Sequence, residues 1–382
     1  MNKWEKVPFA DIFSFYNGKA IKASKIGEYP IYGSNGIIGS SKNYLYCNAI
    51  ILGRVGAYCG SVMYCRNAFW ASDNTLVVDV NEERDDKLYC YYMLQTLRLN
   101  NFAGGSAQPL ITQTILKKLV CPRPSLNQQQ QIAKFLSSYD DLIENNRKQI
   151  KLLEEAAQRL YKEWFVDLRF PGHEETPIVD GVPAGWERKR ADTFFEITIG
   201  KTPPRAEKQW FTSGDKGVPW LSISDMGNAG VYAFYTSEGL TEEAVKKHNM
   251  KIVPIGTIFV SFKLTVGRVA IANTDMCTNE AIAHFYIKDD IYRPYTYCYL
   301  RNFEYDTLGN TSSISKAVNS KIIKSMPFVM PDRDTISSFS EMVSPILDEI
   351  NNKQKACLRL IESRDRLLPK LMSGEIEVLC CI

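Results

Sequence analysis

The stretch LSSYDDLIENNRKQIKLLEEAAQRLYKEW, residues 136–164, decides the fold of the chain. Apolar residues recur in it at every seventh position, at Leu136, Ile143, Ile150, Ala157 and Trp164. A second apolar set follows at Tyr139, Leu153 and Leu160, and Asn146 interrupts the pattern. These are the a and d positions of a heptad, so the stretch predicts a long helix with one apolar stripe.

A second stretch near the C-terminus has the same pattern. Its two apolar sets are Val343, Ile350, Cys357 and Leu371, and Ile346, Leu360 and Leu367, broken by Lys353 and Arg364. Each stretch follows a proline and a capping candidate, Pro124-Ser125 in the first and Pro331-Asp332 in the second. One such helix alone is most often a core helix. Two in one chain favour an antiparallel pair, because a shared seam buries both stripes.

The chain is an internal repeat, and each copy ends in one of these helices. WEKVPFADIFSFYNGK, from Trp4, matches WERKRADTFFEITIGK, from Trp186. LKKLVCPRP at 116–124 has its counterpart in IKSMPFVMP at 323–331. A repeat of this length is a structural unit used twice.

The segments before the helices contain many glycines, aromatics and short β-type runs, such as NAIILGRVG (48–56) and GTIFVSFKLTVGRVAIA (256–272). Two helices are expected within them, at 88–100 and 294–303. We therefore predict an α+β fold with a pseudo-two-fold internal repeat: two mixed, mainly β domains separated by an antiparallel pair of long coiled-coil helices. The predicted segments are 1–125, 126–170, 171–332 and 333–382.

Composition indicates a globular, non-membrane protein and is compatible with a polyanionic partner. Of 382 residues 45% are hydrophobic and 23% charged, which is typical of a globular chain. No run of about 18 apolar residues and no signal peptide is evident, so we expect a cytoplasmic protein without a membrane segment. Residues 1–125 contain 14 Lys and Arg against 9 Asp and Glu. That excess fits a polyanion such as nucleic acid without demanding one.

The sequence lacks the common motifs of catalytic and cofactor-binding sites. The sequence has no GxxxxGK[ST] phosphate loop, no GxGxxG after a strand, and no Asn/Asp-Pro-Pro-aromatic tetrad for adenine methylation. Ten cysteines and three histidines show no CxxC pair or cluster, so neither a metal nor a cofactor is expected. A binding module is favoured. A DNA methyltransferase or nuclease with an unrecognised site stays the alternative, and a coiled-coil scaffold leaves the glycine-rich segments unexplained.

Along its whole length the chain resembles the specificity subunits of type I restriction-modification systems. LYKEWFVDLRFPG (160–172) looks like the family's central region, LLPKLMSGEI (367–376) like its C-terminal ending, and GVPAGW (181–186) like the start of a second recognition domain. VPWLSISDM (218–226), SFKLTVGRVAI (261–271) and TNEAIAHF (278–285) are similar to one type of recognition domain. YPIYGSNGIIG (29–39), ILGRVGAYCG (51–60) and WASDNT (70–75) are similar to another. Gln128–Gln131 departs from the family's usual Glu-Gln pair.

The resemblance implies a non-catalytic subunit that reads a bipartite site in double-stranded DNA. Each target-recognition domain would read one half-site, and the helices would set the gap. Two S-adenosylmethionine-dependent adenine methyltransferase subunits and ATP-driven endonuclease subunits would be the partners. About 30 helical residues span roughly 45 Å, which is compatible with half-site centres about 34–36 Å apart.

Long donors on glycine-containing loops are the candidates for DNA contact. They are Lys19, Tyr32, Ser34, Asn35, Arg54, Gln108, Lys201, Lys263, Arg268 and Lys316. For Arg54 and Arg268 a structural role inside the domain is an equal alternative to guanine recognition. Trp70 and Trp220 are expected to be core aromatics. Methyltransferase docking is expected at the helix ends, at Trp164, Phe165, Leu371 and Met372.

Overall fold

The computed structural model describes residues 4–105, 108–308 and 318–378. Its contacts divide the chain into two compact units. Unit 1 comprises Met1–Glu144 and Leu358–Ile382, and unit 2 comprises Asn145–Cys357. Among the described residues, no helix combines the length and the apolar character needed to cross a bilayer.

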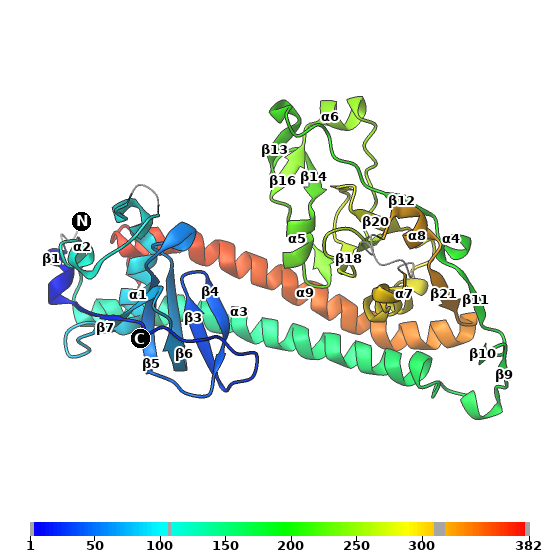
Figure 1. Cartoon of the computed structure of the whole chain (residues 1–382), viewed down its shortest axis with the longest axis horizontal. Helices are drawn as coiled ribbons and strands as arrows, with labels where there is room; N and C mark the ends of the chain where they lie inside the picture. The colour runs from blue at the N-terminus through cyan, green and yellow to red at the C-terminus, as the bar shows by residue number, and fades with distance from the viewer. Residues whose placement is uncertain (1–3, 106–107, 309–317, 379–382) are drawn as a thin grey trace. The chain divides into compact units, whose positions relative to one another are not determined.

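A six-stranded sheet forms the centre of unit 1 (Figure 1). Its strand order is β2 (Phe13–Asn17), β7 (Thr75–Val80), β5 (Tyr46–Gly53), β6 (Val62–Ala71), β3 (Tyr29–Gly33) and β4 (Gly36–Ser41). All pairs are antiparallel except β3 with β6. Ile50 and Leu52 face the main core with helix α1 (Lys87–Thr96), whereas Ile51 faces a smaller core on the other side. This alternation follows from the period of two in a strand.

A two-stranded ribbon of β1 (Glu5–Pro8) and β8 (Val120–Arg123) completes unit 1, together with α2 (Gln113–Lys117). At its end Arg123 donates two hydrogen bonds to Asp85, each of 2.8 Å. The amide of Gln129 donates to the same carboxylate at 3.0 Å. Asp85 is 1% exposed and Gln129 fully buried. Unit 1 therefore contains a buried polar triad, Asp85–Arg123–Gln129, between its sheet and its long helix.

The described residues of unit 2 form two sheets, a ribbon and a hairpin. The larger sheet has the order β12 (Ile197–Ile199), β20 (Ile282–Phe285), β17 (Ile258–Ser261), β18 (Val269–Ala272) and β15 (Tyr232–Ala233). The smaller has β13 (Phe211–Ser213), β16 (Glu238–Leu240), β14 (Val218–Leu221) and β19 (Cys277–Thr278). The ribbon pairs β11 (Glu187–Arg190) with β21 (Pro327–Met330), and the hairpin pairs β9 (Ile178–Val179) with β10 (Val182–Pro183). Besides its segments of the two long helices, the described residues of unit 2 form the short helices α4 (Ala191–Phe194), α5 (Ile223–Asn228), α6 (Glu242–Lys247), α7 (Tyr292–Asn302) and α8 (Ser320–Lys324).

The predicted internal repeat is confirmed at the level of single hydrogen bonds. Strands β2-β7-β5-β6 of unit 1 have the same order and pairing as β12-β20-β17-β18 of unit 2. The N–H of Phe9 donates to the carbonyl of Leu119 at 2.8 Å, and that of Ala191 to the carbonyl of Met326 at 2.9 Å. Both predicted internal helices exist, as α1 and α7, but α1 ends at Thr96, four residues before the predicted end, because Arg98 adopts a left-handed backbone. The α+β fold class is thus confirmed.

Both long helices begin where their capping residues predict. α3 spans Leu126–Tyr161 and ends in a π-helical turn, Lys162–Val166. α9 spans Arg333–Met372. The hydroxyl of Ser125 accepts from the N–H of Gln128 at 3.4 Å, and the carboxylate of Asp332 from the N–H of Thr335 at 2.9 Å. These bonds satisfy N–H groups that a helix start leaves without partners.

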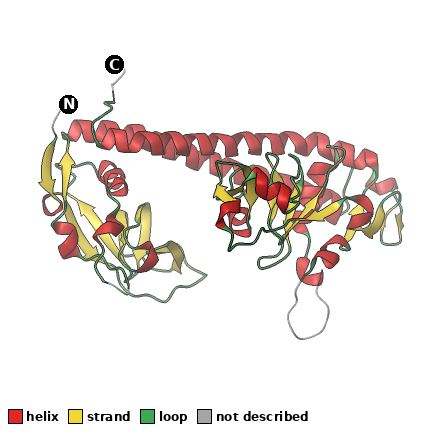
Figure 2. Ribbon diagram, turned by 90° about the horizontal axis from the view of Figure 1, so that it is seen from above, coloured by secondary structure: helices red, strands yellow, loops and turns green. Residues whose placement is uncertain are grey.

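Within each unit, a segment of α9 packs antiparallel against a segment of α3 (Figures 1 and 2). In unit 1 Arg364 pairs with Asp140 at 2.5 Å, which explains why a charged residue interrupts the apolar stripe. In unit 2 Trp164 contacts Phe339, with ring centroids 5.8 Å apart. In each long helix the first apolar set is largely buried and the second is half-buried. One edge of each apolar stripe therefore faces the partner helix.

Both helices contribute to both units, because contacts group each half of a helix with the domain beside it. The division of the chain into two domains and two separate spacer segments, 126–170 and 333–382, stays a prediction.

Candidate nucleic-acid interface

Several loops of unit 1 meet at one end of its sheet. There β2 ends at Asn17, opposite Leu76, and β5 ends at Gly53, opposite Thr75. The segments that leave or enter the strands at this end are 18–19, 54–61 and 72–74. Because their strands are adjacent, the segments lie together, and we call them the loop end of unit 1.

The larger sheet of unit 2 has the same loop end. β17 ends at Ser261, opposite Ile282 of β20, and β12 ends at Ile199, opposite Ala283. The corresponding segments are 200–201, 262–268 and 279–281. Two matching surfaces, one in each unit, therefore present loops in the same relation to their strands.

A glycine in each unit allows two of these segments to touch. A Cβ atom on Gly18 would lie 1.9 Å from the carbonyl oxygen of Ser72, and one on Gly200 would lie 2.2 Å from that of Asn279. No side chain fits at such distances, so only glycine permits this approach of backbone to backbone. The approach fixes the lysine that follows each glycine at the loop end.

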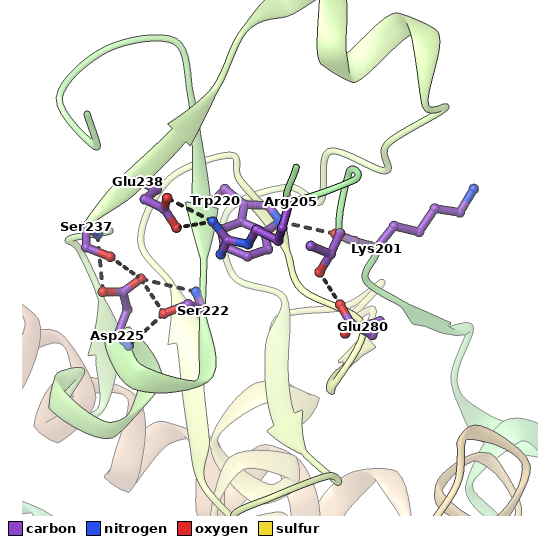
Figure 3. A network of polar contacts seen from close by, with 9 residues as sticks. Lys201, Arg205, Trp220, Ser222, Asp225, Ser237, Glu238 and Glu280 are labelled. Carbon is purple, nitrogen blue, oxygen red and sulfur yellow. Dashed lines mark hydrogen bonds and ion pairs between the residues drawn. The ribbon is translucent and has the colours of Figure 1, made fainter. Parts of the chain in front are cut away.

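Each of these lysines is held through its backbone in the same way. The N–H of Lys19 donates to Ala71 at 2.9 Å, and that of Lys201 to Thr278 at 3.0 Å. The indole of Trp70 donates to the carbonyl of Lys19 at 2.8 Å, and that of Trp220 to Lys201 at 3.1 Å (Figure 3). Trp220 is 1% exposed, whereas Trp70 is half-buried. The indoles thus act as supports for the lysine backbone.

The lysine side chains themselves extend towards solvent. Lys19 is exposed, and so is Lys201, whose Nζ donates to the carbonyl of Asn249 at 3.2 Å. Figure 3 shows the side chain of Lys201 directed away from Trp220 and Glu280. A cation carried on a fixed backbone suits the recognition of phosphate as a point charge.

Arg54 lies in the loop end of unit 1 with one donor that has no protein acceptor. Its Nη1 donates to Oδ1 of Asn17 at 3.3 Å, and Nε2 of Gln113 donates to the same oxygen at 3.2 Å. Its Nε is buried and, among the described residues, has no hydrogen-bond partner. A buried donor without an acceptor is costly, so the position favours an acceptor that arrives with a ligand.

Arg268 occupies a different position in the repeat from Arg54. Its Nη1 donates to the carbonyl of Ile223 at 2.7 Å, just as the hydroxyl of Ser61 donates to Ser34 at 2.6 Å in unit 1. The position of Arg54 is taken in unit 2 by Phe262. One donor of Arg268 therefore serves the fold, and a DNA contact by this residue stays a prediction.

The remaining DNA candidates of unit 1 reach the same loop end. Ser34 is buried and donates to the carbonyl of Asn74 at 2.7 Å, while Asn35 is exposed in the turn between β3 and β4. Tyr32 packs edge-on against Phe69, and burial raises the pKa of its hydroxyl. Gln108 is exposed beside Pro109, whose carbonyl accepts from Gly56.

In unit 2, Lys263 is exposed in the loop between β17 and β18. Lys316 lies outside the described residues.

The candidates for methyltransferase docking lie in hydrophobic cores. Trp164 is 6% exposed, and Phe165 packs against Phe339 with ring centroids 4.9 Å apart. Leu371 and Met372 are 1% and 5% exposed in the core of unit 1. All four close the ends of the long helices within their own units, and a docking role for them stays a prediction.

Sequence reasoning missed Arg205. Its guanidinium lies over the rings of Phe211 and Trp220, 4.4 and 4.6 Å from their centroids. It also donates to both carboxylate oxygens of Glu238, at 2.8 and 2.7 Å (Figure 3). The residue follows Pro203-Pro204, which have neither the acidic or amide residue before them nor the aromatic residue after them that an adenine-methylation tetrad requires. No local signal reveals a stacking partner that is distant in sequence.

Comparisons with known proteins agree with these observations. The model of the family described as "Type I restriction modification DNA specificity domain" matches residues 1–155 and 183–359. The type I restriction enzyme MjaIX specificity subunit of Methanocaldococcus jannaschii is 30% identical over 318 residues, which cover 76% of this chain and 69% of that protein. The HindI specificity subunit of Haemophilus influenzae is 26% identical over 336 residues, which cover 70% of this chain and 71% of that protein.

A solved structure shares the fold. It is the crystal structure of the type I restriction-modification system S subunit from M. genitalium, with a TM-score of 0.62 at 18% sequence identity and 96% coverage of both chains. Together with the two matches to the family model, the coverage of the relatives settles the assignment. The chain belongs to the family of type I restriction-modification DNA specificity subunits.

Proposed function

We propose that the chain is the sequence-specific DNA-binding subunit of a type I restriction-modification complex and that each loop end reads one half of a bipartite site. The observation that carries this proposal is the gathering of predicted DNA-contacting residues at one end of each sheet. In unit 1 backbone hydrogen bonds join Lys19 and Arg54 to the same segment, through Ala71 and Asn74. In unit 2 Lys201 and Lys263 flank the matching segment, 279–281.

The chemistry of these side chains suits two kinds of DNA contact. Lysines on fixed backbone segments bind phosphates, which positions the protein without reading sequence. In the major groove, arginine donates two hydrogen bonds to guanine, and an amide side chain donates one to adenine and accepts one from it, which discriminates between bases. Both kinds of side chain lie in each loop end, so each unit can position itself on the phosphates and read the bases.

The subunit carries out no methyl transfer or DNA cleavage in this proposal. Those activities belong to two adenine methyltransferase subunits and to ATP-dependent endonuclease subunits of the assembled complex. The methyltransferases dock at the ends of the long helices. Val166, 56% exposed beside the buried Trp164, and Ile376, 36% exposed after Met372, offer apolar contact area there. We expect the complex to work in the cytoplasm, where the DNA is.

Methylation mapping of cells that carry the intact system tests the reading function. Replacing residues 1–120 with the first domain of another family member should change one half of the methylated sequence and leave the other half intact. The repeat supplies the reason, since each unit contains a complete sheet and loop end. If both half-sites were lost in a folded, assembled complex, the units would not read independently.

A matched insertion tests the helices as spacers. Seven residues would be added to α3 after Glu144 and seven to α9 after Cys357, at the boundary between the units. Because α3 and α9 are antiparallel, the double insertion preserves the seam and lengthens it by about 10 Å. We expect a longer gap between unchanged half-sites. A change of half-site sequence at constant gap would refute the spacer role.

Single substitutions separate base reading from phosphate binding. Arg54→Ala should weaken binding to the true site by roughly 1–3 kcal/mol, with the loss confined to one half-site. Titration against matched and half-mismatched duplexes measures this. Equal losses on all duplexes would demote Arg54 to a structural residue or a phosphate contact.

A further inference from the structure

The loop between β17 and β18 displays a leucine in a conformation that leucine rarely adopts. Leu264 has a φ of +64° and a side chain that is 92% exposed. The N–H of Thr265 donates to the carbonyl of Lys263 at 2.8 Å, so Leu264 is the central residue of a tight turn. Both the positive φ and the exposure of an apolar side chain are unfavourable in the isolated protein.

The matching loop of unit 1 shows what this position requires for folding. Gly60 donates to the carbonyl of Gly53 at 2.8 Å, as Gly267 does to Ser261 at 2.9 Å, so a backbone hydrogen bond closes both loops, although the loop of unit 1 is one residue longer. Gly56, the third residue after Gly53, has a φ of +74°, which is the same left-handed backbone as that of Leu264, the third residue after Ser261. A Cβ atom on Gly56 would meet nothing within 4 Å. Glycine adopts this backbone without strain, so the turn itself does not require a leucine.

A buried serine holds the leucine loop in place. Ser261 is fully buried, and its hydroxyl donates to the carbonyl of Thr265 at 2.5 Å. The same hydroxyl accepts from the N–H of Arg268 at 3.0 Å. Both bonds join Ser261, which precedes Leu264, to residues that follow it, so the loop is tied across its base. A side chain on a fixed base needs no ordering when it meets a partner, which favours a binding role.

We propose that Leu264 is an apolar wedge that enters the base stack of bound duplex DNA and opens one step in the half-site of unit 2. The proposal rests on the proposed function, because the loop end of unit 2 must face the DNA. Lys263, exposed next to Leu264, and Lys201, across the same loop end, place cations where phosphates flank the opened step. Leucine is one of the side chains that DNA-bending proteins insert between base pairs.

The test uses the full-length chain assembled with its methyltransferase subunits, on duplexes that carry the methylated sequence of the system. 2-Aminopurine, whose fluorescence rises when it unstacks, is placed at each step of the unit 2 half-site in turn. We expect the wild type to raise the fluorescence several-fold at one step. Leu264→Gly, which keeps the turn, should abolish that rise and lower affinity about tenfold, whereas Leu264→Met should keep both.

A mismatched duplex distinguishes a wedge from an ordinary contact. A mismatch at the opened step removes part of the unstacking cost, so the wild type should bind it more tightly than the matched duplex. Leu264→Gly should gain less from the mismatch. Ile255→Ser is the matched control, since Ile255 is 62% exposed at the opposite end of β17. It should behave as the wild type.

Three outcomes would overturn the wedge. One is an unchanged fluorescence rise in Leu264→Gly. Another is loss of methyltransferase assembly in that variant with unaltered DNA distortion, which would make Leu264 a protein contact. A wild type that binds the specific duplex without unstacking any step would refute the wedge and leave the proposed function standing. A wild type that binds no duplex specifically would overturn both.

Discussion

Units 1 and 2 have the same four-stranded frame but differ in the side chains that fill it. In unit 1 the ribbon meets the long helix through the buried charges of Arg123 and Asp85. At the positions of Arg123 and Gln129, unit 2 has Met330 and Ile336, in an apolar core. The backbone hydrogen bonds that define the loop ends are nevertheless the same. The close approach of backbone segments therefore specifies the shared frame. The side chains packed within the frame can be either polar or apolar.

A second difference lies inside the sheets. Val77 of β7 is buried in unit 1, and its counterpart in β20 is His284, also buried. The ring of His284 lies between two hydroxyls, Thr198 at 2.9 Å and Thr278 at 2.7 Å. Both of its nitrogens are thus satisfied without a charge. This arrangement makes unit 2, and not unit 1, sensitive to acid at this position.

The largest expected effect comes from a substitution that gives unit 1 the residue that unit 2 has at the same position. Arg123→Met leaves the carboxylate of Asp85 buried without its cation, which should lower the free energy of unfolding by about 3–5 kcal/mol. Hydrogen exchange resolved by peptide should show β8 losing protection while β21 keeps it. Unchanged protection of β8 would mean that the buried charges contribute little.

Completing the exchange sharpens this comparison. In Asp85→Leu/Arg123→Met/Gln129→Ile the charges and their desolvation are removed together. Replacing a buried ion pair by apolar residues is often neutral or stabilising, so the triple variant should regain most of the lost protection. If it were as unstable as Arg123→Met alone, the polar triad would be required by the local geometry of unit 1.

The next largest effect is the response of unit 2 to acid. Burial lowers the pKa of His284 from its ordinary value of 6.5 to about 3. The unfolded state therefore binds the proton first, and stability that is fully present above pH 6.5 is lost as the pH falls towards 3. The loss is about 1.4 kcal/mol per pH unit, or roughly 2 kcal/mol at pH 5. Denaturant titrations between pH 7.5 and 5 measure it.

His284→Val, which copies unit 1, is the matched variant. It leaves Thr278 and Thr198 without the ring, so we expect lower stability at pH 7.5 than in the wild type. The slope between pH 6.5 and 5 should nevertheless become shallower, because the titrating group is gone. An unchanged slope would assign the acid response to other groups.

The frame could be predicted from the sequence because it leaves periodic and repeated signals. The heptads from Leu136 and Val343 predict both long helices, and the paired motifs from Trp4 and Trp186 predict the repeat. The capping residues Ser125 and Asp332 place the helix starts correctly. These signals are either local or come from the similarity of two segments of the same sequence. They can therefore be found without knowing the tertiary structure.

The site was only partly predictable because its contacts join residues distant in sequence. Glycine followed by a long donor pointed to Lys19, Lys201 and Arg54, which do lie at the loop ends. Strand pairing places Trp220 under Arg205, and no local sequence pattern predicts that pairing. The same holds for Arg268 and Ser61, which both donate a hydrogen bond to a backbone carbonyl at matching positions of the repeat. Tyr58, 60% exposed in the loop of unit 1, and Leu264 also escaped notice, because exposure of one side chain is invisible in a sequence.

A smaller effect is expected from the two helix caps, which differ between the repeats. Ser125→Ala removes a bond to Gln128 and should cost about 1 kcal/mol. Asp332→Ala should cost about 2 kcal/mol, because Asp332 also accepts from the indole of Trp186 at 3.0 Å. Thermal unfolding of both variants at pH 7.5 compares them. Equal losses would mean that the bond to Trp186 adds nothing to the cap.

The smallest expected effect concerns the two lysines that the repeat holds alike. If Lys19 and Lys201 each neutralise one phosphate, either alanine variant should reduce the slope of log K against log salt by about 0.9. The loss of affinity should be the same on specific and random duplexes, since phosphate contacts carry no sequence information. Lys6→Ala, an exposed lysine on β1 away from the loop end, is the matched control and should leave the slope unchanged. Lys201 is bonded to Asn249 in the free protein, so its variant tests whether that bond gives way to a phosphate. A reduced slope for Lys19→Ala but not for Lys201→Ala would show that the two loop ends, though built alike, do not hold DNA alike.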